Sequence, residues 1–167
     1  MTKEILIEND YQQFFVEKMP TYDKVTYDAN DGVVVIPTVV GRYCFIDQVS
    51  RESVPHSLEL IRGFIENDES PVEAALRELN EEIGFTVDQT SIDSVREFPS
   101  FSANSELTTQ KIHVVLVQLR SSPKHIKLET QEGVDNIHWI EKCQLRYIID
   151  EITDGVTLSA LLKAKIV

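Results

Sequence analysis

The sequence lacks the segments that would carry the chain into or across a membrane. None of its apolar runs approaches the roughly eighteen residues that a membrane-spanning helix needs. Residues 1–15 carry acidic side chains where a secretory signal peptide would carry a hydrophobic stretch. We therefore expect a cytoplasmic protein with no membrane partner.

Cysteine is nearly absent, which argues against disulfide bonds and zinc sites, two common sources of stability. Cys44 and Cys143 are far apart, and neither they nor the four histidines show the spacing of a zinc site. We predict no disulfide and no zinc, and we expect both thiols to be reduced and buried. A chain of 167 residues with 42% apolar side chains can instead rely on a hydrophobic core that buries roughly 70% of the unfolded surface.

Basic residues are also scarce. The chain has 16 Lys and Arg residues against 28 Asp and Glu residues, which gives a formal net charge of −12. A protein that binds nucleic acid by neutralising its phosphates needs basic side chains gathered on one face. We therefore expect no nucleic-acid partner, whereas an anionic small molecule held through a divalent cation is compatible with this charge.

The pattern of apolar residues predicts one domain in which helices pack on a mixed sheet. No internal repeat, low-complexity tract or Pro/Gly-rich linker divides residues 1–167. Runs rich in β-branched and aromatic residues predict strands at 33–40, 43–49, 57–61, 111–119 and 134–140. Helices are predicted at 70–84, 141–152 and 157–166. This order indicates the α/β (α+β) class, and Pro37 suggests an edge or a bulge in the first strand.

The clearest helix signal lies in the middle of the chain and carries a cluster of acids. Ser70 opens a capping-box pattern, and Gly84 can end the helix. Steps of three and four residues place Glu78, Glu81 and Glu82 on one face, where each pair of like charges costs a few tenths of a kcal/mol. A hard divalent cation would relieve this repulsion, because Mg²⁺ and Mn²⁺ prefer oxygen ligands. For an isolated cluster of this kind, a solvated charged face is the alternative.

The sequence around these acids favours the metal. From Gly63 to Phe85 the chain fits G-x5-E-x7-R-E-U-x-E-E-x-G-U without a gap, where U is a bulky apolar residue. Its seven fixed identities and two apolar positions would arise by chance less than roughly once in a million chains. The segment closely resembles the Nudix box of the Nudix hydrolase family. The resemblance implies the Nudix αβα sandwich, a mixed sheet with helices on both faces.

The resemblance also assigns roles to the matched positions. Glu78, Glu81 and Glu82 match the metal ligands, and the main-chain carbonyl of Arg62 matches a further ligand. Glu81 and Glu82 are assigned to catalysis as well, and the implied cofactor is Mg²⁺ or Mn²⁺. Glu132, in a loop late in the fold, is expected to be the catalytic base, with Glu129 as the alternative.

Four positions of the box are expected to have structural roles. Gly63 would let the backbone come close to a metal or a phosphate. Glu69 and Arg77 would form an ion pair that ties the loop to the helix, and Gly84 would end the helix in the left-handed conformation.

Outside the box the sequence partly resembles the ADP-ribose and nucleotide-sugar pyrophosphatases of the family. The matching positions are expected to bind substrate, and they are Arg51, Glu59, Pro99 and Glu106. Pro99 is expected to open a specificity loop that runs to Glu106. Three aromatic residues are candidate platforms for a base: Tyr43, Phe45 and Phe101. The chain departs from the subgroup at Ile61 and Arg62, which stand where those enzymes have Pro-Ala.

These features predict a metal-dependent hydrolase of a nucleoside diphosphate linked to another group. The expected substrate is ADP-ribose or a related nucleotide sugar, and the products are a nucleoside monophosphate and a phosphorylated group. Two alternatives stay open: a house-cleaning nucleoside triphosphate pyrophosphatase, and a catalytically silent Nudix-fold module that binds a ligand. Residues 1–30 are predicted to be an N-terminal extension that can form a homodimer.

Overall fold

The structure is built around one strand, residues 32–39, in which every residue is buried. The computed structural model describes residues 3–48, 57–84, 91–122 and 134–167. Its strands are β1 (Lys3–Glu8), β2 (Gln12–Lys18), β3 (Asp23–Ala29), β4 (Gly32–Val39), β5 (Arg42–Gln48), β6 (Ser57–Glu59), β7 (Ile61–Phe64), β8 (Ile92–Phe101), β9 (Ile112–Leu119) and β10 (Val134–Glu141). Its helices are α1 (Pro71–Ile83), α2 (Lys142–Ile148), the 3₁₀ helix η2 (Ile149–Glu151) and α3 (Gly155–Lys163).

Strand β4 changes partner part-way along one edge, which makes it the centre of a seven-stranded mixed sheet. It pairs in parallel with β9 on one edge, and antiparallel with β7 and then β5 on the other. The prediction of an edge or a bulge at Pro37 is wrong, because Pro37 lies inside β4 opposite Val117 of β9. A residue without an N–H is tolerated there since, among the described residues, 36 and 37 lie between the segments paired with β7 and β5.

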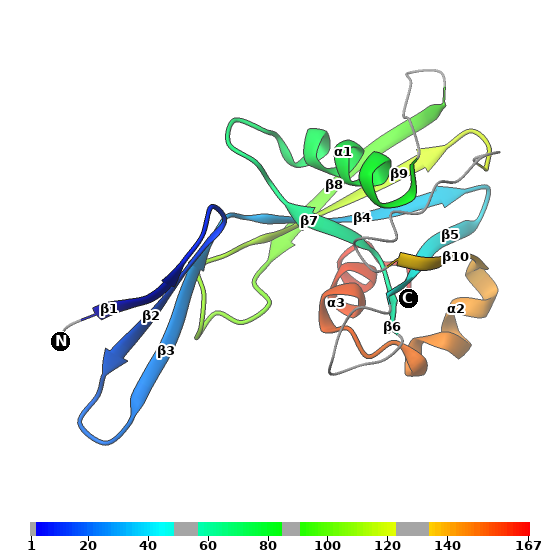
Figure 1. The fold of residues 1–167 in the computed structure, drawn as a ribbon. Coiled ribbons are helices and arrows are strands. Elements are labelled where there is room, and N and C mark those ends of the chain that lie inside the picture. The colour runs from blue at the N-terminus through cyan, green and yellow to red at the C-terminus, as the bar shows by residue number, and fades with distance from the viewer. Residues whose placement is uncertain (1–2, 49–56, 85–90, 123–133) are drawn as a thin grey trace.

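Alternate side chains of β4 point into two hydrophobic cores, one on each face of the sheet. Val33 and Val35 pack with α1, whereas Val34 and Ile36 pack with residues of α2 and α3. Figure 1 shows α1 above the sheet and α2 and α3 below it. The predicted α/β (α+β) sandwich is therefore confirmed. Among the described residues, no helix is long and apolar enough to cross a membrane.

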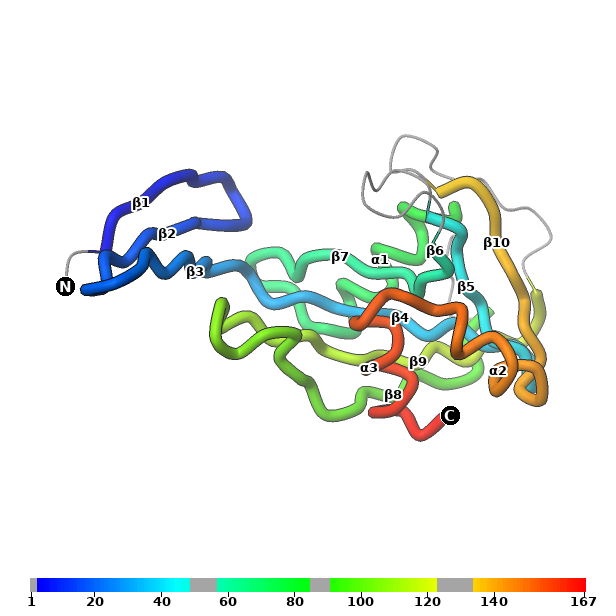
Figure 2. The backbone as a smooth tube through the Cα atoms, turned by 90° about the horizontal axis from the view of Figure 1, so that it is seen from below, coloured from blue at the N-terminus to red at the C-terminus, as the bar shows by residue number. Residues whose placement is uncertain are grey.

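The first three strands form a separate antiparallel sheet in the order β1-β2-β3. This N-terminal sheet projects from the body of the molecule, as Figures 1 and 2 show. Its inner end is fixed to the body, since the N–H of Tyr27 donates to the carbonyl of Leu107 at 2.8 Å. The rings of Tyr11 and Phe64 also stack there, with centroids 5.4 Å apart. Along the outer edge of this sheet, every residue of β1 is exposed.

The structure differs from the sequence prediction at several points. The sheet formed by residues 3–29 was not predicted, and neither was β8. Because β8 includes Pro99, the loop predicted to begin there begins at Ser102. Cys44 is buried as expected, and burial raises the pKa of its thiol to about 12. Cys143 is exposed instead, because the short helix α2 buries only Leu145.

Helix α1 begins and ends where the sequence predicts. Ser70 and Glu73 form a reciprocal capping box: the N–H of Glu73 donates to Ser70 Oγ at 3.2 Å, and the N–H of Ser70 donates to the Glu73 carboxylate at 2.9 Å. Gly84 ends the helix in the left-handed conformation, with φ of 61°, and its N–H donates to the carbonyl of Leu79. These caps fix where the acidic face of α1 lies along the helix.

We expect Ser70→Ala to lower the free energy of unfolding by about 1 kcal/mol, because the first turn of α1 loses its capping acceptor. For a chain of this size, Tm should fall by about 2–4 °C. Thermal melts test this, with Ser105→Ala as the control, since Ser105 is exposed in a turn outside the helices. A melt of Ser70→Ala that overlays the wild type would contradict the role given to the cap.

Candidate functional site

Gly63 allows the carboxylate of Glu78 to lie directly against the backbone of β7. A Cβ atom placed on Gly63 would be 1.9 Å from Glu78 Oε1, so no other residue fits at position 63 without displacing this carboxylate. The peptide bond before Gly63 carries the carbonyl of Arg62. The first residue of the box therefore brings an acidic side chain next to the backbone segment in which a further oxygen ligand is predicted.

Arg77 links the loop of the box to the acidic face of α1. Its Nε and Nη2 each donate to one carboxylate oxygen of Glu69 at 3.0 Å, so the predicted ion pair is present. Nη2 also donates to the carbonyl of Phe64 at 2.7 Å. Nη1 donates to Glu78 at 2.6 Å and to Glu81 at 2.8 Å. One guanidinium therefore binds three carboxylates and the end of β7.

These contacts change the ionisation of the groups involved. Hydrogen bonding to Arg77 holds the pKa of the Glu69 carboxyl below its ordinary value, although burial acts in the opposite direction. The same interaction with Glu69 raises the pKa of Arg77, and Glu78 and Glu81 raise it further. Arg77 therefore stays charged and offsets part of the repulsion among the carboxylates of α1.

The acidic face of α1 offers the hard oxygen donors that Mg²⁺ and Mn²⁺ prefer. Glu78 and Glu82 are each only 6% exposed, whereas Glu81 is exposed. As the described side chains stand, no group of three or more acids, histidines or cysteines converges into a metal site. Glu78 and Glu81 are instead directed at Arg77. The donor chemistry and the cradle at Gly63 fit a divalent cation, but binding it requires these carboxylates to reorient.

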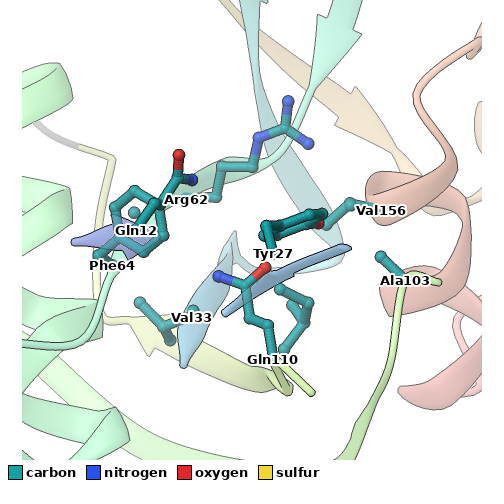
Figure 3. Close-up of a pocket in the computed structure, with 11 residues that line it drawn as sticks. Gln12, Tyr27, Val33, Arg62, Phe64, Ala103, Gln110 and Val156 are labelled. Carbon is teal, nitrogen blue, oxygen red and sulfur yellow. The ribbon is translucent and has the colours of Figure 1, made fainter. Parts of the chain in front are cut away.

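Two adjoining cavities lie beside this face. The carboxylate cavity, of about 360 Å³, is lined by Tyr11, Arg62, Gly63, Phe64, Glu66, Arg77, Glu78 and Glu81. The N-terminal cavity, of about 510 Å³, lies between the N-terminal sheet and the body, and its wall includes Gln12, Tyr27, Val33, Gln110, Ile112 and Val156 (Figure 3). Both cavities share residues 62–64 of β7. The two cavities therefore adjoin at β7.

Arg62 anchors β7 to α3. Its Nη1 donates to both carboxylate oxygens of Asp154 at 2.9 and 3.0 Å, and Nη2 pairs with Glu59 at 2.7 Å. Asp154 also caps α3 by accepting from the N–H of Thr157, whose hydroxyl accepts from the N–H of Leu60. Burial alone would raise the pKa of Asp154, but the charge of Arg62 and the bonds from Thr157 lower it. The arginine that replaces alanine of the subgroup thus has a structural role.

The residues predicted to bind substrate do not converge in the described part of the chain. Glu59 is 2% exposed and contacts Arg62. Pro99 lies in β8 and lines a separate cavity next to the end of α3. Glu106 is exposed in the turn after β8. The remaining predicted residues lie outside the described ranges: Arg51, Glu129 and Glu132.

The sequence patterns missed the residues that line the cavities from the N-terminal sheet. These are Tyr11, Gln12 and Tyr27, which belong to no recognisable motif. The aromatic residues that the sequence suggested as platforms for a base do not line these cavities. Phe45 is fully buried, and Tyr43 and Phe101 pack against the core that includes α2 and α3. The sequence signal for strands here is the aromatic and β-branched runs at 14–16 and 25–27.

Comparisons with known proteins agree with this geometry. Residues 29–156 match the NUDIX domain model. The ADP compounds hydrolase NudE of Escherichia coli (strain K12) is 25% identical over 134 residues, a match that covers 80% of this chain and just under two thirds, 66%, of NudE. A crystal structure of an ADP compounds hydrolase has the same fold, with a TM-score of 0.71 and 16% identity over 99% of this chain and 90% of that one. Because the NUDIX match spans well over half of its length, this chain belongs to the Nudix family.

Proposed function

We propose that this protein is a metal-dependent Nudix hydrolase that cleaves the diphosphate of an ADP compound, with ADP-ribose or a related nucleotide sugar as the substrate. One observation carries the proposal: the acidic face of α1 lines a cavity that adjoins, at residues 62–64 of β7, a larger cavity whose lining includes no acidic side chain. This arrangement suits a substrate with a charged diphosphate and a bulky uncharged end. The 25% identity to NudE, an ADP compounds hydrolase, supports ADP compounds as the substrate class.

The chain's own oxygens would hold the cation. The donors are the carboxylates of Glu78, Glu81 and Glu82 and the main-chain carbonyl of Arg62, with Mg²⁺ or Mn²⁺ as the cofactor. When bound, such a cation neutralises phosphate charge and lowers the pKa of a coordinated water. Arg77 remains between the helix and β7 and keeps the acidic face close to the backbone.

For the other predicted residues we propose the roles that the sequence indicates, except that the role of Glu59 is indirect. Glu132 is proposed as the catalytic base and Arg51 as a substrate ligand. The proposed role of Glu59 in substrate binding is indirect: its carboxylate pairs at 2.7 Å with Arg62, which lines both cavities, and so helps to hold the cavity wall in place. Pro99 and Glu106 are proposed to shape specificity from β8 and the turn that follows it.

The proposed function predicts hydrolysis that depends strictly on a divalent cation. Purified protein should be assayed with Mg²⁺ or Mn²⁺ on ADP-ribose, nucleotide sugars, dinucleoside polyphosphates and dNTPs. We expect ADP-ribose or a nucleotide sugar to give the highest kcat/KM, and excess chelator to abolish turnover. A preference of about tenfold for dNTPs, or about 1.4 kcal/mol, would favour the triphosphate pyrophosphatase. Absence of turnover on the whole panel would favour a silent ligand-binding module.

The acidic face of α1 predicts a second result. Glu81→Gln and Glu82→Gln should each lower kcat by about two orders of magnitude or more, because stabilisation of the transition state is lost while the helix remains packed. Their affinity for Mn²⁺, measured by calorimetry, should fall as well. The matched control is Glu151→Gln, since Glu151 is exposed in η2. If both variants kept wild-type kcat, the assignment of these residues would be wrong.

We also propose that residues 1–167 act as one domain whose N-terminal sheet forms a homodimer. The exposed apolar side chains of β1 support this: Ile5, Leu6 and Ile7 are 53, 53 and 63% exposed, and β1 is an edge strand of the three-stranded sheet that the described residues form. The two free thiols suit a reducing compartment, so the cytoplasm is the proposed location.

The dimer predicts a measurable change in mass. Light scattering at tens of micromolar protein should report about 38 kDa, twice the 19.1 kDa of the chain. Ile7→Lys should shift the protein toward the monomer, because it places a charge in the apolar surface of β1. Val40→Lys is the control, since Val40 is 79% exposed in the turn between β4 and β5. A monomeric wild type would refute the dimer.

A further inference from the structure

The side-chain amide of Gln110 has a fixed orientation in the wall of the N-terminal cavity. Its Nε2 donates to the main-chain carbonyl of Asn30 at 2.7 Å. Only the amino end of an amide can donate to a carbonyl, so the other end of the amide must be the acceptor Oε1. Figure 3 shows this side chain extending into the cavity toward Tyr27. Among the described residues, no donor is bonded to Oε1.

The chain around Gln110 holds this orientation in place. The N–H of Gln110 donates to the hydroxyl of Thr108 at 3.0 Å, and Thr108 is buried. On the other side, the N–H of Asn30 donates to the carbonyl of Tyr11 at 3.0 Å. Rotating the amide by half a turn would place its oxygen against the carbonyl of Asn30. The cavity therefore presents an acceptor at this point of its wall.

The rest of the N-terminal cavity suits a nucleobase. Its volume of about 510 Å³ lies within the range of small-molecule sites. The ring of Tyr27 offers an aromatic surface, and Val33, Ile112 and Val156 line the cavity with apolar atoms. The amide of Gln12, at the start of β2, adds a donor and an acceptor. The acids that line the carboxylate cavity do not line this one.

We propose that Gln110 determines base specificity by selecting a base with an exocyclic amino group, namely adenine, over a 6-keto purine. This inference rests on the proposed function and names the group that the N-terminal cavity takes. The amino group of adenine can donate to Oε1 of Gln110. Hypoxanthine presents a carbonyl oxygen at the same place, which would set two acceptors against each other in a partly desolvated site. A site built to accept a hydrogen bond rejects an analogue that cannot donate one.

The test compares substrates and products that differ only at this position of the base. In wild type, kcat/KM for ADP-ribose should exceed that for IDP-ribose by about tenfold or more, and AMP should bind more tightly than IMP by a similar factor in calorimetry. Gln110→Leu should reduce both ratios to about threefold or less, mainly because kcat/KM for ADP-ribose and the affinity for AMP fall. Gln118→Leu is the matched control, because Gln118 is half-buried on β9, donates to a main-chain carbonyl and lines neither cavity.

The turnover and binding measurements together distinguish a failure of this inference from a failure of the proposed function. If wild type binds AMP and IMP equally, or IMP more tightly, the role of Gln110 is overturned whatever the turnover. If AMP is preferred but no diphosphate is hydrolysed, the inference stands and the proposed hydrolase fails. Should Gln110→Leu fail to fold, the wild-type ratios still decide, since a ratio near one for both pairs contradicts the proposal. An unchanged preference in folded Gln110→Leu would also overturn it.

Discussion

The interaction of Arg77 with the carboxylates around it is the constraint on which the site depends. Without this guanidinium, Glu78 and Glu81 would repel each other on one helix face, and the loop that carries Glu69 would have no charged partner on α1. The bond from Nη2 to the carbonyl of Phe64 adds the end of β7 to the same group. Helix, loop and strand are therefore held by one side chain, and the Gly63 cradle depends on their relative position.

A second set of contacts attaches the N-terminal sheet and α3 to opposite ends of β7. Phe64 stacks on Tyr11, whereas Arg62 pairs with Asp154 at the start of α3. The three residues 62–64 thus contact elements from the two ends of the chain. They also separate the carboxylate cavity from the N-terminal cavity. Because β7 pairs with the fully buried strand β4, both cavities share a wall that the hydrophobic cores hold in place.

The sequence predicted the parts of this structure that depend on residues close together in the chain. The caps of α1, the pair between Glu69 and Arg77 and the strand with continuous apolar residues are set by neighbours in the chain. Features that depend on distant contacts were not predictable. Pro37 is accommodated by a change of strand partner, and the cavity residues Gln12 and Tyr27 reach the site only through the packing of a second sheet. No spacing within the box indicates either arrangement.

The position of β2 gives the far tip of the N-terminal sheet an influence on the site. Tyr11 and Gln12 are consecutive, yet they line different cavities. Strand β3 is fixed to the body, and β2 takes its register from the turn at residues 19–22. An insertion or deletion of one residue in that turn which slips β2 against β3 would replace Gln12 with a neighbour and reverse the face of every side chain in the strand. The length of this exposed turn, although the turn is distant from the cavities, therefore decides which side chains of β2 line them.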